Sequence, residues 1–377
     1  MTTRAQTSRD VFLVHWGRTG AGPLFLRDLT SAFVDAGHRT TVSYNKEAEG
    51  AGRFPPGARA LVVRTYRTVV GAVLSLPRSV WNAYRLHRAL REARDPVVIG
   101  TMEHLHQSLL VPIVARRHGT YVAIIHDVKL HSGDENLIRR LNRIVELRCA
   151  HVVLTLSNAD EIVARDGQRI VQSVHPAFLA PDADTVHAAA RHGGPARVGF
   201  FGRLVPYKGL ELLPEVGRML AEAIPAEPLK VHGAGPLADA DFLVESPHVE
   251  LDARWIPEDE VPALVSELDV VVLPYTEASQ SGVIALAMGL GVPCVVTPVG
   301  GLVQQAEETG AAHVARDLTP AGITAALVEV LTDSHLYTTL VESGLAASSG
   351  EYSWHRLADD IVRALPAPAP DPRGARG

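Results

Sequence analysis

The sequence predicts an α/β protein of two tandem domains, each a doubly wound parallel sheet with helices on both faces. Three observations lead to this fold class. The chain has 377 residues, which is more than a single hydrophobic core usually holds. Short, nearly continuous apolar runs alternate with helix-period segments, as buried parallel strands require. This alternation stops at a stretch rich in Pro, Ala and Asp, residues 176–195, and then starts again.

The first half begins with an apolar strand at residues 11–16, followed by a glycine-rich turn and a helix at 23–36. Gly37 ends that helix, because glycine easily adopts the left-handed backbone of a helix C-terminus. Six more apolar runs are predicted as strands, at residues 40–44, 60–63, 97–100, 121–126, 151–156 and 170–174. These elements define a first domain over residues 1–178.

The second half repeats this alternation over residues 190–350. Its strands are predicted at residues 198–201, 229–232, 249–252, 270–273 and 293–297, and its helices at 210–223, 258–268, from 282, 302–308 and 320–331. A last helix at 352–365 precedes a tail, 366–377, whose Pro, Ala, Gly and Arg content predicts disorder. Ligands of doubly wound sheets bind outside the carboxyl ends of the strands, so we expect the two domains to face each other across a cleft there.

The composition indicates a globular protein whose halves differ in charge. The two cysteines, Cys149 and Cys294, lie in opposite halves, which argues against a disulfide framework and for a reducing compartment. No apolar run reaches the roughly 18–20 residues that span a bilayer, and the polar N-terminus has no signal-peptide core. We therefore expect a cytoplasmic protein. Residues 1–180 carry a net charge of +9 and the remainder −15, which predicts different partners for the two domains.

The strongest motif follows the first strand of the second half. That strand ends at Gly202, and two cations, Arg203 and Lys208, follow within six residues. A guanidinium fork and an ammonium point charge together can neutralise a diphosphate. Lys208 is one of only four lysines in a chain that strongly favours arginine, which indicates that an ammonium group is needed there. The alternative is a surface turn with solvated charges.

A second motif is a small polar loop that leads into a helix. It contains Glu277, Ser279, Ser281, Gly282 and Val283 after the strand at 270–273. Backbone N–H groups and the helix dipole at such a loop attract anions, so we predict contacts with the phosphates of a ligand. The alternative is a simple helix N-cap.

Two glycine pairs complete the predicted donor site. Gly233 and Gly235 follow the strand at 229–232, where a tight turn is the stronger interpretation. Gly20 and Gly22 belong to a turn with the spacing G-x-x-G-x-G, without an acidic residue about twenty positions later. That spacing disfavours nicotinamide dinucleotide binding and leaves a loop that contacts sugar or phosphate.

His126 is the predicted catalytic residue of the first half. It stands at the carboxyl end of a strand with Asp127 beside it, although a lone histidine is more often structural. Glu103 and His104 are candidates for binding an acceptor. We see no Cys pair, His-Glu-x-x-His or Asp-x-Asp pattern, so we predict neither a metal nor a cofactor.

Taken together, these residues resemble the GT-B glycosyltransferases, and most closely the retaining group 1 (GT4-type) family with its two Rossmann-like domains. The resemblance covers nearly the whole chain. It is firmest over residues 198–301 and at Tyr352-Ser353-Trp354, which is typical of the place where the family's last helix returns to the first domain.

The resemblance implies a role for each motif. The positions that match Arg203 and Lys208 bind the donor diphosphate in the family, and the loop that matches residues 281–283 supplies backbone amides. The position that matches His126 lies against the donor sugar, and the loop that matches residues 20–22 lines the cleft. In this family the two carboxylates of an E-x7-E motif often bind the sugar or phosphate and the ribose. Aligned on Gly282 and Ala287-Met288, Ser279 and Leu286 stand at or beside those positions here, as in a branch with a Ser-Gln-Ser-Gly-Val loop.

The expected function is therefore transfer of a sugar from a nucleoside-diphosphate sugar to a hydroxyl acceptor, with retention and without a metal. Arg203, Lys208 and His126 would be the catalytic residues. The acceptor would be a saccharide, a lipid-linked molecule or a small molecule in envelope polysaccharide, glycolipid or natural-product biosynthesis. The alternative is a catalytically impaired nucleotide-sugar-binding protein. A phosphorylase ranks lower, because Lys208 and Lys230 are the only lysines in the second half that could hold pyridoxal phosphate.

An arginine-rich amphipathic stretch, residues 64–94, allows two interpretations. A basic surface with aromatic residues suits an anionic membrane or a lipid-diphosphate acceptor, which would place the protein peripherally on the inner membrane face. An ordinary helix packed on the sheet is the alternative. Nucleic-acid binding is disfavoured, because no basic–aromatic stacking motif is evident and the second half is acidic.

Overall fold

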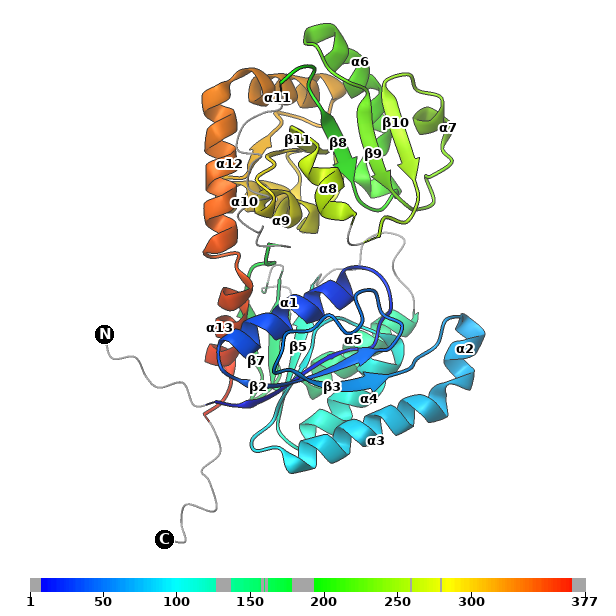
Figure 1. Ribbon diagram of the computed structural model, residues 1–377, viewed down its shortest axis with the longest axis vertical. Coiled ribbons are helices and arrows are strands. Elements are labelled where there is room, and N and C mark those ends of the chain that lie inside the picture. The colour runs from blue at the N-terminus through cyan, green and yellow to red at the C-terminus, as the bar shows by residue number, and fades with distance from the viewer. Residues whose placement is uncertain are drawn as a thin grey trace, which may run out of the picture. The chain divides into compact units, whose positions relative to one another are not determined.

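The computed structural model describes residues 8–126, 137–156, 159, 162–177, 193–257, 260–278 and 280–367. The chain divides into two compact units (Figure 1). Unit 1 comprises Met1–Val174 together with Trp354–Gly377, and unit 2 comprises His175–Ser353. Most of the predicted tail, residues 368–377, and most of the stretch between the two halves lie outside the described residues.

Unit 1 contains a sheet of seven parallel strands in the order β3-β2-β1-β4-β5-β6-β7. The strands are β1 (Asp10–His15), β2 (Arg39–Asn45), β3 (Arg59–Val63), β4 (Val97–Gly100), β5 (Thr120–Ile125), β6 (Val152–Thr155) and β7 (Arg169–Gln172). The helices are α1 (Ala21–Asp35), α2 (Val69–Leu74), α3 (Leu76–Glu92), α4 (Leu105–Arg116), α5 (Leu137–Cys149) and α13 (Trp354–Ala364).

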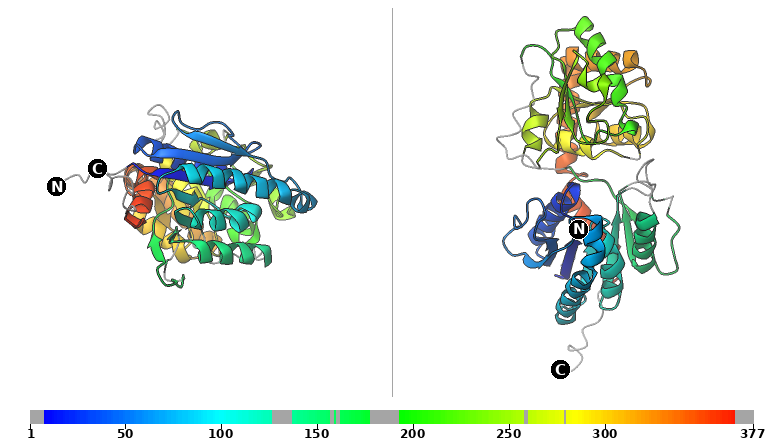
Figure 2. Two further views of the ribbon diagram at one scale, coloured as in Figure 1. Left: turned by 90° about the horizontal axis from the view of Figure 1, so that it is seen from below. Right: turned by 90° about the vertical axis from the view of Figure 1, so that its right-hand side faces the viewer.

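Both faces of this sheet are covered, which explains why every residue of its central strands β1, β4, β5 and β6 is buried. On β1, Val11 and Leu13 pack with α1 and α13, whereas Phe12 and Val14 pack with the helices of the other face. Helices α3, α4 and α5 lie side by side on that other face (Figure 2). The last helix, α13, packs against α1, and the ring of Trp354 meets that of Phe25 edge to face at 4.8 Å.

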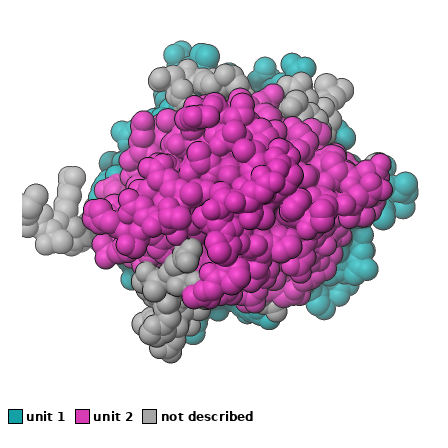
Figure 3. All heavy atoms as spheres, turned by 90° about the horizontal axis from the view of Figure 1, so that it is seen from above, with its two compact units in different colours: residues 1–174, 354–377 teal, residues 175–353 magenta. Residues whose placement is uncertain are grey.

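Unit 2, whose atoms are magenta in Figure 3, contains six parallel strands in the order β10-β9-β8-β11-β12-β13. The strands are β8 (Val198–Phe201), β9 (Leu229–Gly233), β10 (Val249–Ala253), β11 (Val270–Leu273), β12 (Cys294–Val296) and β13 (Ala312–Val314). The helices are α6 (Leu213–Ala223), α7 (Asp241–Val244), α8 (Val261–Ser266), α9 (Gly282–Gly289), α10 (Gly300–Thr309), α11 (Pro320–Thr332) and α12 (Ser334–Ser349), with short 3₁₀ turns η3 (Pro206–Lys208) and η4 (Leu210–Leu212) before α6.

The two sheets share one strand order, in which the first strand of each unit lies between its second and fourth. This order is that of Rossmann-like doubly wound domains, so the predicted fold class is confirmed. The predicted helix at 210–223 starts later, because η3 and η4 tighten the chain over residues 206–212 before α6 begins. Among the helices of the described residues, none has both the length and the apolarity to cross a membrane.

Candidate functional site

In unit 2, the loop after β8 packs backbone to backbone on the loop after β9. The Gly202 N–H donates to the carbonyl of His232 (N···O 3.0 Å). A Cβ on Gly233 would lie 1.8 Å from the Gly202 carbonyl oxygen, and a Cβ on Gly235 would lie 2.4 Å from that of Leu204. Only glycine fits such an approach. Loop packing therefore explains both glycines, in line with the tight-turn interpretation, and their contact with a donor stays a prediction.

The cation loop, residues 203–209, is also fixed to the loop after β11. Gly209 has a left-handed backbone (φ 65°), and a Cβ there would lie 1.9 Å from the Pro274 carbonyl oxygen. The Thr276 N–H donates to the carbonyl of Tyr207 (N···O 2.9 Å). Because η3 is held from both sides, the side chains of Arg203 and Lys208 start from a rigid backbone.

Lys208 lies over an aromatic ring that the sequence analysis did not single out. Its Nζ is 3.6 Å from the ring centroid of Tyr275, a distance at which the face of the ring attracts a cation. Tyr275 is fully buried, and this burial raises the pKa of its phenol, so the ring is neutral at physiological pH. On the same loop, Arg203 Nη2 donates to the hydroxyl of Tyr207 (3.2 Å). The loop therefore presents two positive charges at the carboxyl edge of the unit 2 sheet.

The start of α9 lies beside this loop. The Val283 side chain is 4.0 Å from the place that a Cβ on Gly202 would take. Ser281 caps the helix, because its Oγ accepts a hydrogen bond from the Val283 N–H (3.2 Å). The Gln305 side chain accepts from the Ser281 N–H (2.9 Å) and donates to the Ser281 carbonyl (3.1 Å). Two of the three predicted amide donors are thus engaged within the protein, and among the hydrogen bonds of the described residues none comes from the third, the Gly282 N–H; an N–H group and a helix dipole in this place attract a phosphate.

The family's two glutamate positions remain without carboxylates. Ser279 lies outside the described residues. Leu286 is 6% exposed, and its neighbour Ala287, which stands eight residues after Ser279 as the E-x7-E spacing requires, is fully buried, whereas Glu277 is exposed. An acidic side chain at position 286 or 287 would therefore need a different local packing from the one this helix has.

In unit 1, His126 stands directly after β5, as predicted. Its Nε2 lies 2.8 Å from the carbonyl oxygen of Thr101, so this nitrogen carries the proton in the neutral ring and Nδ1 is an acceptor. The ring also meets Phe25 edge to face at 4.7 Å. These contacts fix its orientation. Asp127, its predicted neighbour, lies outside the described residues.

The sequence analysis missed His15, which ends β1 beneath the glycine turn. Its ring is 4% exposed, and a Cβ on Gly17 or Gly22 would lie 2.4 or 2.3 Å from its Nε2. These glycines therefore make room for a histidine, whereas Gly20 is needed for its positive φ of 85°. Burial, together with the charge of nearby His126, lowers the pKa of His15 to about 4. The signal that indicated His126, a histidine at a strand's carboxyl end, was present here too.

Glu103 and His104, the predicted acceptor residues, are both engaged. The Glu103 carboxylate accepts a hydrogen bond from Arg143 of α5. The His104 ring stacks on Tyr66 with centroids 5.3 Å apart, and burial, followed by the charges of His15 and His106, lowers its pKa to about 3. At neutral pH the carboxyl edge of the unit 1 sheet therefore carries His15 and His104 in their uncharged form, and the Glu103 carboxylate is paired with Arg143. Among the described residues, no three His, Cys, Asp or Glu side chains are grouped to hold a metal ion.

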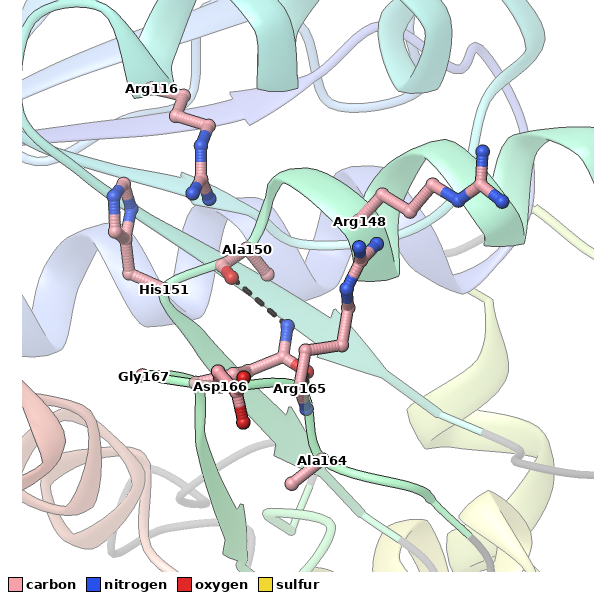
Figure 4. A pocket seen from close by; sticks show the side chains of 9 residues that line it. Arg116, Arg148, Ala150, His151, Ala164, Arg165, Asp166 and Gly167 are labelled. Carbon is pink, nitrogen blue, oxygen red and sulfur yellow. Dashed lines mark hydrogen bonds between the residues drawn. The ribbon is translucent and has the colours of Figure 1, made fainter.

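A pocket of about 420 Å³ lies elsewhere on unit 1 (Figure 4). Arg116, Arg148, Arg165 and His151 line it, with Gln168 donating to the carbonyl of Ala150 at its base (3.0 Å). Its walls come from the segments that precede β5, β6 and β7, so it lies at the amino edge of the sheet. It is thus separate from the predicted site residues, which lie at the carboxyl edge.

Comparisons with known proteins agree with this arrangement. Residues 195–333, which include α9 and the loops after β8 and β11, match the family "Glycosyl transferases group 1". The chain is 27% identical over 184 residues to D-inositol 3-phosphate glycosyltransferase of Corynebacterium urealyticum, covering 45% of this chain and 43% of that protein. It is 30% identical over 260 residues to the enzyme of the same name from Salinispora arenicola, covering 61% and 56%. The chain thus spans about half the length of these curated relatives.

Similarity to solved structures extends over nearly the whole chain. Anabaena HepE, solved in complex with UDP and glucose, aligns with 94% of this chain and 98% of its own, with a TM-score of 0.68 and 16% sequence identity. At this identity the match establishes the fold, which is that of the GT-B glycosyltransferases.

Proposed function

We propose that this chain is a glycosyltransferase that moves a sugar from a nucleoside-diphosphate sugar to a hydroxyl acceptor, with retention of configuration and without a metal ion. The observation that carries the proposal is the cation loop, in which Arg203 and Lys208 are held beside the start of α9. The match of residues 195–333 to a glycosyltransferase family supports it, as do the relatives' names and the UDP in the HepE complex.

The chemistry follows from where charge develops. When the bond between the anomeric carbon and the diphosphate breaks, negative charge builds on the leaving phosphate. Arg203 can bind two phosphate oxygens as a fork, and Lys208 supplies a compact positive charge. Because both stand on a rigid loop, they need little reorganisation as the charge appears, and they stabilise the transition state more than the bound donor. The dipole of α9 adds to this effect.

On unit 1, the proposal assigns His126 to the donor sugar and Glu103 and His104 to the acceptor. His126 is held by Thr101 with Nδ1 as an acceptor, which suits a hydrogen bond from a sugar hydroxyl. In the proposed reaction the acceptor hydroxyl attacks from the side of the leaving phosphate, so the configuration is retained, and that phosphate can take up the proton of the hydroxyl. No protein base is then required, and His126 acts by positioning.

One observation favours a second candidate, a protein that binds the donor but does not transfer the sugar. No carboxylate stands at Ser279, at Leu286 or at Ala287, where the family carries its glutamates, and both Leu286 and Ala287 are buried. Loss of these carboxylates would weaken ribose or sugar contacts without removing the diphosphate site.

A donor screen distinguishes the two candidates. Purified protein is incubated with a panel of nucleotide sugars, and binding is measured by calorimetry while release of nucleoside diphosphate is measured in parallel. We expect one donor to bind and to release its diphosphate. Binding of a donor without release, with saccharide, lipid-linked and small-molecule acceptors all present, would identify the impaired protein, and no binding of any donor would refute both.

Matched variants test the cation loop. Lys208→Met and Arg203→Ala should each lower turnover by about 10²–10³, because each removes one charge from the developing phosphate. Lys230→Met and Arg316→Ala are the controls, since Lys230 lies near Glu227 and Glu267 and Arg316 pairs with Asp317, away from this loop. Unchanged turnover in the first pair would refute the assigned roles. Retention is checked by NMR of the first-formed product, and metal independence by activity in excess EDTA.

A further inference from the structure

Helices α2 and α3 carry large apolar side chains on the outside of unit 1. Val70, Val73 and Leu74 of the short helix α2 are 70%, 74% and 77% exposed, which is rare for consecutive turns of aliphatic residues. On α3, Trp81 and Tyr84 stack on each other with centroids 5.4 Å apart, and both are about half exposed. Figure 1 shows α2 at the end of α3, away from the sheet.

These residues are additional to those that pack α3 on the sheet. The inner side of α3 is formed by Ser79, Asn82, Ala83, Leu86, Ala89 and Leu90, all of them buried. The ordinary packing of an amphipathic helix is therefore already satisfied. It does not account for the apolar residues on the opposite side.

The charge around these residues has one sign. Residues 50–91 contain eight arginines and no Asp, Glu or Lys. Arg67 is bound by Glu47, and Arg85 donates to the Val62 carbonyl (2.7 Å). Arg78 and Arg88 are exposed on α3 near Trp81 and Tyr84 in sequence. We define the α2–α3 face as Val70, Val73, Leu74, Trp81, Tyr84, Arg78 and Arg88.

We propose that the α2–α3 face docks unit 1 onto an anionic lipid bilayer. The aliphatic side chains of α2 enter the acyl boundary, the rings of Trp81 and Tyr84 lie at the headgroup level, and the arginines bind lipid phosphates. The anionic surface contributes an attraction for each arginine, and the apolar insertion supplies the rest. This inference stands on exposure and charge in unit 1 and does not depend on the proposed sugar transfer.

A second copy of the chain is a less suitable occupant. If two α2–α3 faces met, arginines from both copies would be brought together without a carboxylate between them, because residues 50–91 contain none. An anionic bilayer satisfies both the apolar and the charged parts of the face.

Vesicle flotation of the full chain tests the proposal. Vesicles of phosphatidylcholine alone are compared with equimolar phosphatidylcholine and phosphatidylglycerol. We expect flotation with the second composition only, weakened by added salt. Arg78→Gln and Arg88→Gln should each lower the partition coefficient by about fivefold, and Val73→Asp by more, since it places a like-charged group against the lipid.

Matched controls come from unit 2. Val244→Asp changes another exposed valine, which is 59% exposed on α7, and Arg316→Gln changes an exposed arginine. Both should float like the wild type. Equal losses in Val73→Asp and Val244→Asp, or no flotation with anionic vesicles, would overturn the proposal. So would a dimer that Val73→Asp dissociates in the absence of any vesicle binding.

Two further measurements exclude misfolding and loss of the proposed donor site as causes of a change in flotation. All variants lie at exposed positions, and an unchanged thermal midpoint shows that they fold. Nucleotide-sugar binding should be the same in Val73→Asp and wild type, so a failure of membrane docking is distinguishable from a failure of the proposed donor site.

Discussion

The carboxyl edges of the two sheets differ in chemistry although their strand orders are the same. In unit 2 the edge carries Arg203 and Lys208 on a loop that is fixed through its backbone, with glycines pressed against carbonyl oxygens. In unit 1 the edge carries His15, His104 and His126, which are held through side-chain contacts. The unit 2 edge presents two positive charges, whereas burial lowers the pKa of His15 and His104 on the unit 1 edge and so keeps these two rings neutral at physiological pH.

Under the proposed function, this difference would allow one fold to bind two kinds of ligand. A diphosphate needs charges that do not move, and backbone-to-backbone packing provides a base with few alternative conformations. A hydroxyl-rich sugar or acceptor needs hydrogen-bonding groups without net charge, and buried neutral histidines provide them. The following variants test whether the unit 2 loop depends on its backbone and the unit 1 edge on its side chains.

Gly209→Ala should have the largest effect. The left-handed backbone and the Pro274 carbonyl, 1.9 Å from the new Cβ, both oppose a side chain, so unit 2 should lose about 3 kcal/mol of unfolding free energy. Urea unfolding and donor calorimetry measure the loss. Gly193→Ala is the control, since no atom lies within 4 Å of its added Cβ. A stability like that of the control would show that the loop is not set by its backbone.

His15→Gln should change how stability depends on pH. The unfolded chain takes up a proton on this histidine below about pH 6.5, whereas the folded chain does not until about pH 4. Wild-type stability therefore falls as the pH falls through this window. The variant cannot take up that proton, so relative to wild type it should gain on the order of 3 kcal/mol between pH 7 and pH 4.

Urea unfolding at several pH values measures this gain, with the exposed His335→Gln as the control. If the curves of His15→Gln and wild type ran parallel over the whole range, His15 would not be neutral by burial in the folded protein.

Gln305→Ala should disturb the start of α9. It leaves the N–H and the carbonyl of the buried Ser281 without their partner, at a cost of about 2 kcal/mol. Donor affinity should fall as well, because the Ser281 cap orients the first turn of the helix. The neighbouring Gln304→Ala is the control, as Gln304 bonds only to Glu308 among the contacts described. Equal stability of the two variants would argue against this positioning role.

Gly22→Ala should have the smallest effect on stability, and the sign of this effect should depend on His15. In the wild type the new Cβ meets the His15 ring, and the variant should lose about 1 kcal/mol. In a His15→Ala background the ring is gone, and alanine should stabilise α1 by about 1 kcal/mol relative to glycine. Urea unfolding of the four proteins measures the coupling. If Gly22→Ala changed the stability in the same direction in both backgrounds, the His15 ring would not be the reason for a glycine at position 22.

Local patterns in the sequence were enough to predict much of the fold. The alternation of apolar runs with helical periods depends only on residues close in the chain, and it led to both sheets. Arg203, Lys208 and His126 were predicted as site residues because ligands of this kind of sheet bind at the carboxyl ends of its strands. The resemblance to group 1 glycosyltransferases came from the same short segments.

The partners of these residues could not be read in the same way. Tyr275 beneath Lys208, Gln305 at Ser281 and His15 beneath Gly22 each join segments that are distant in the chain or come from different elements. Their contacts arise when strands and helices pack, and packing also decides which histidines lose water and so remain neutral. The charged residues at the strand ends can be identified from the sequence alone, whereas the orientation and protonation of their side chains depend on which groups folding packs against them.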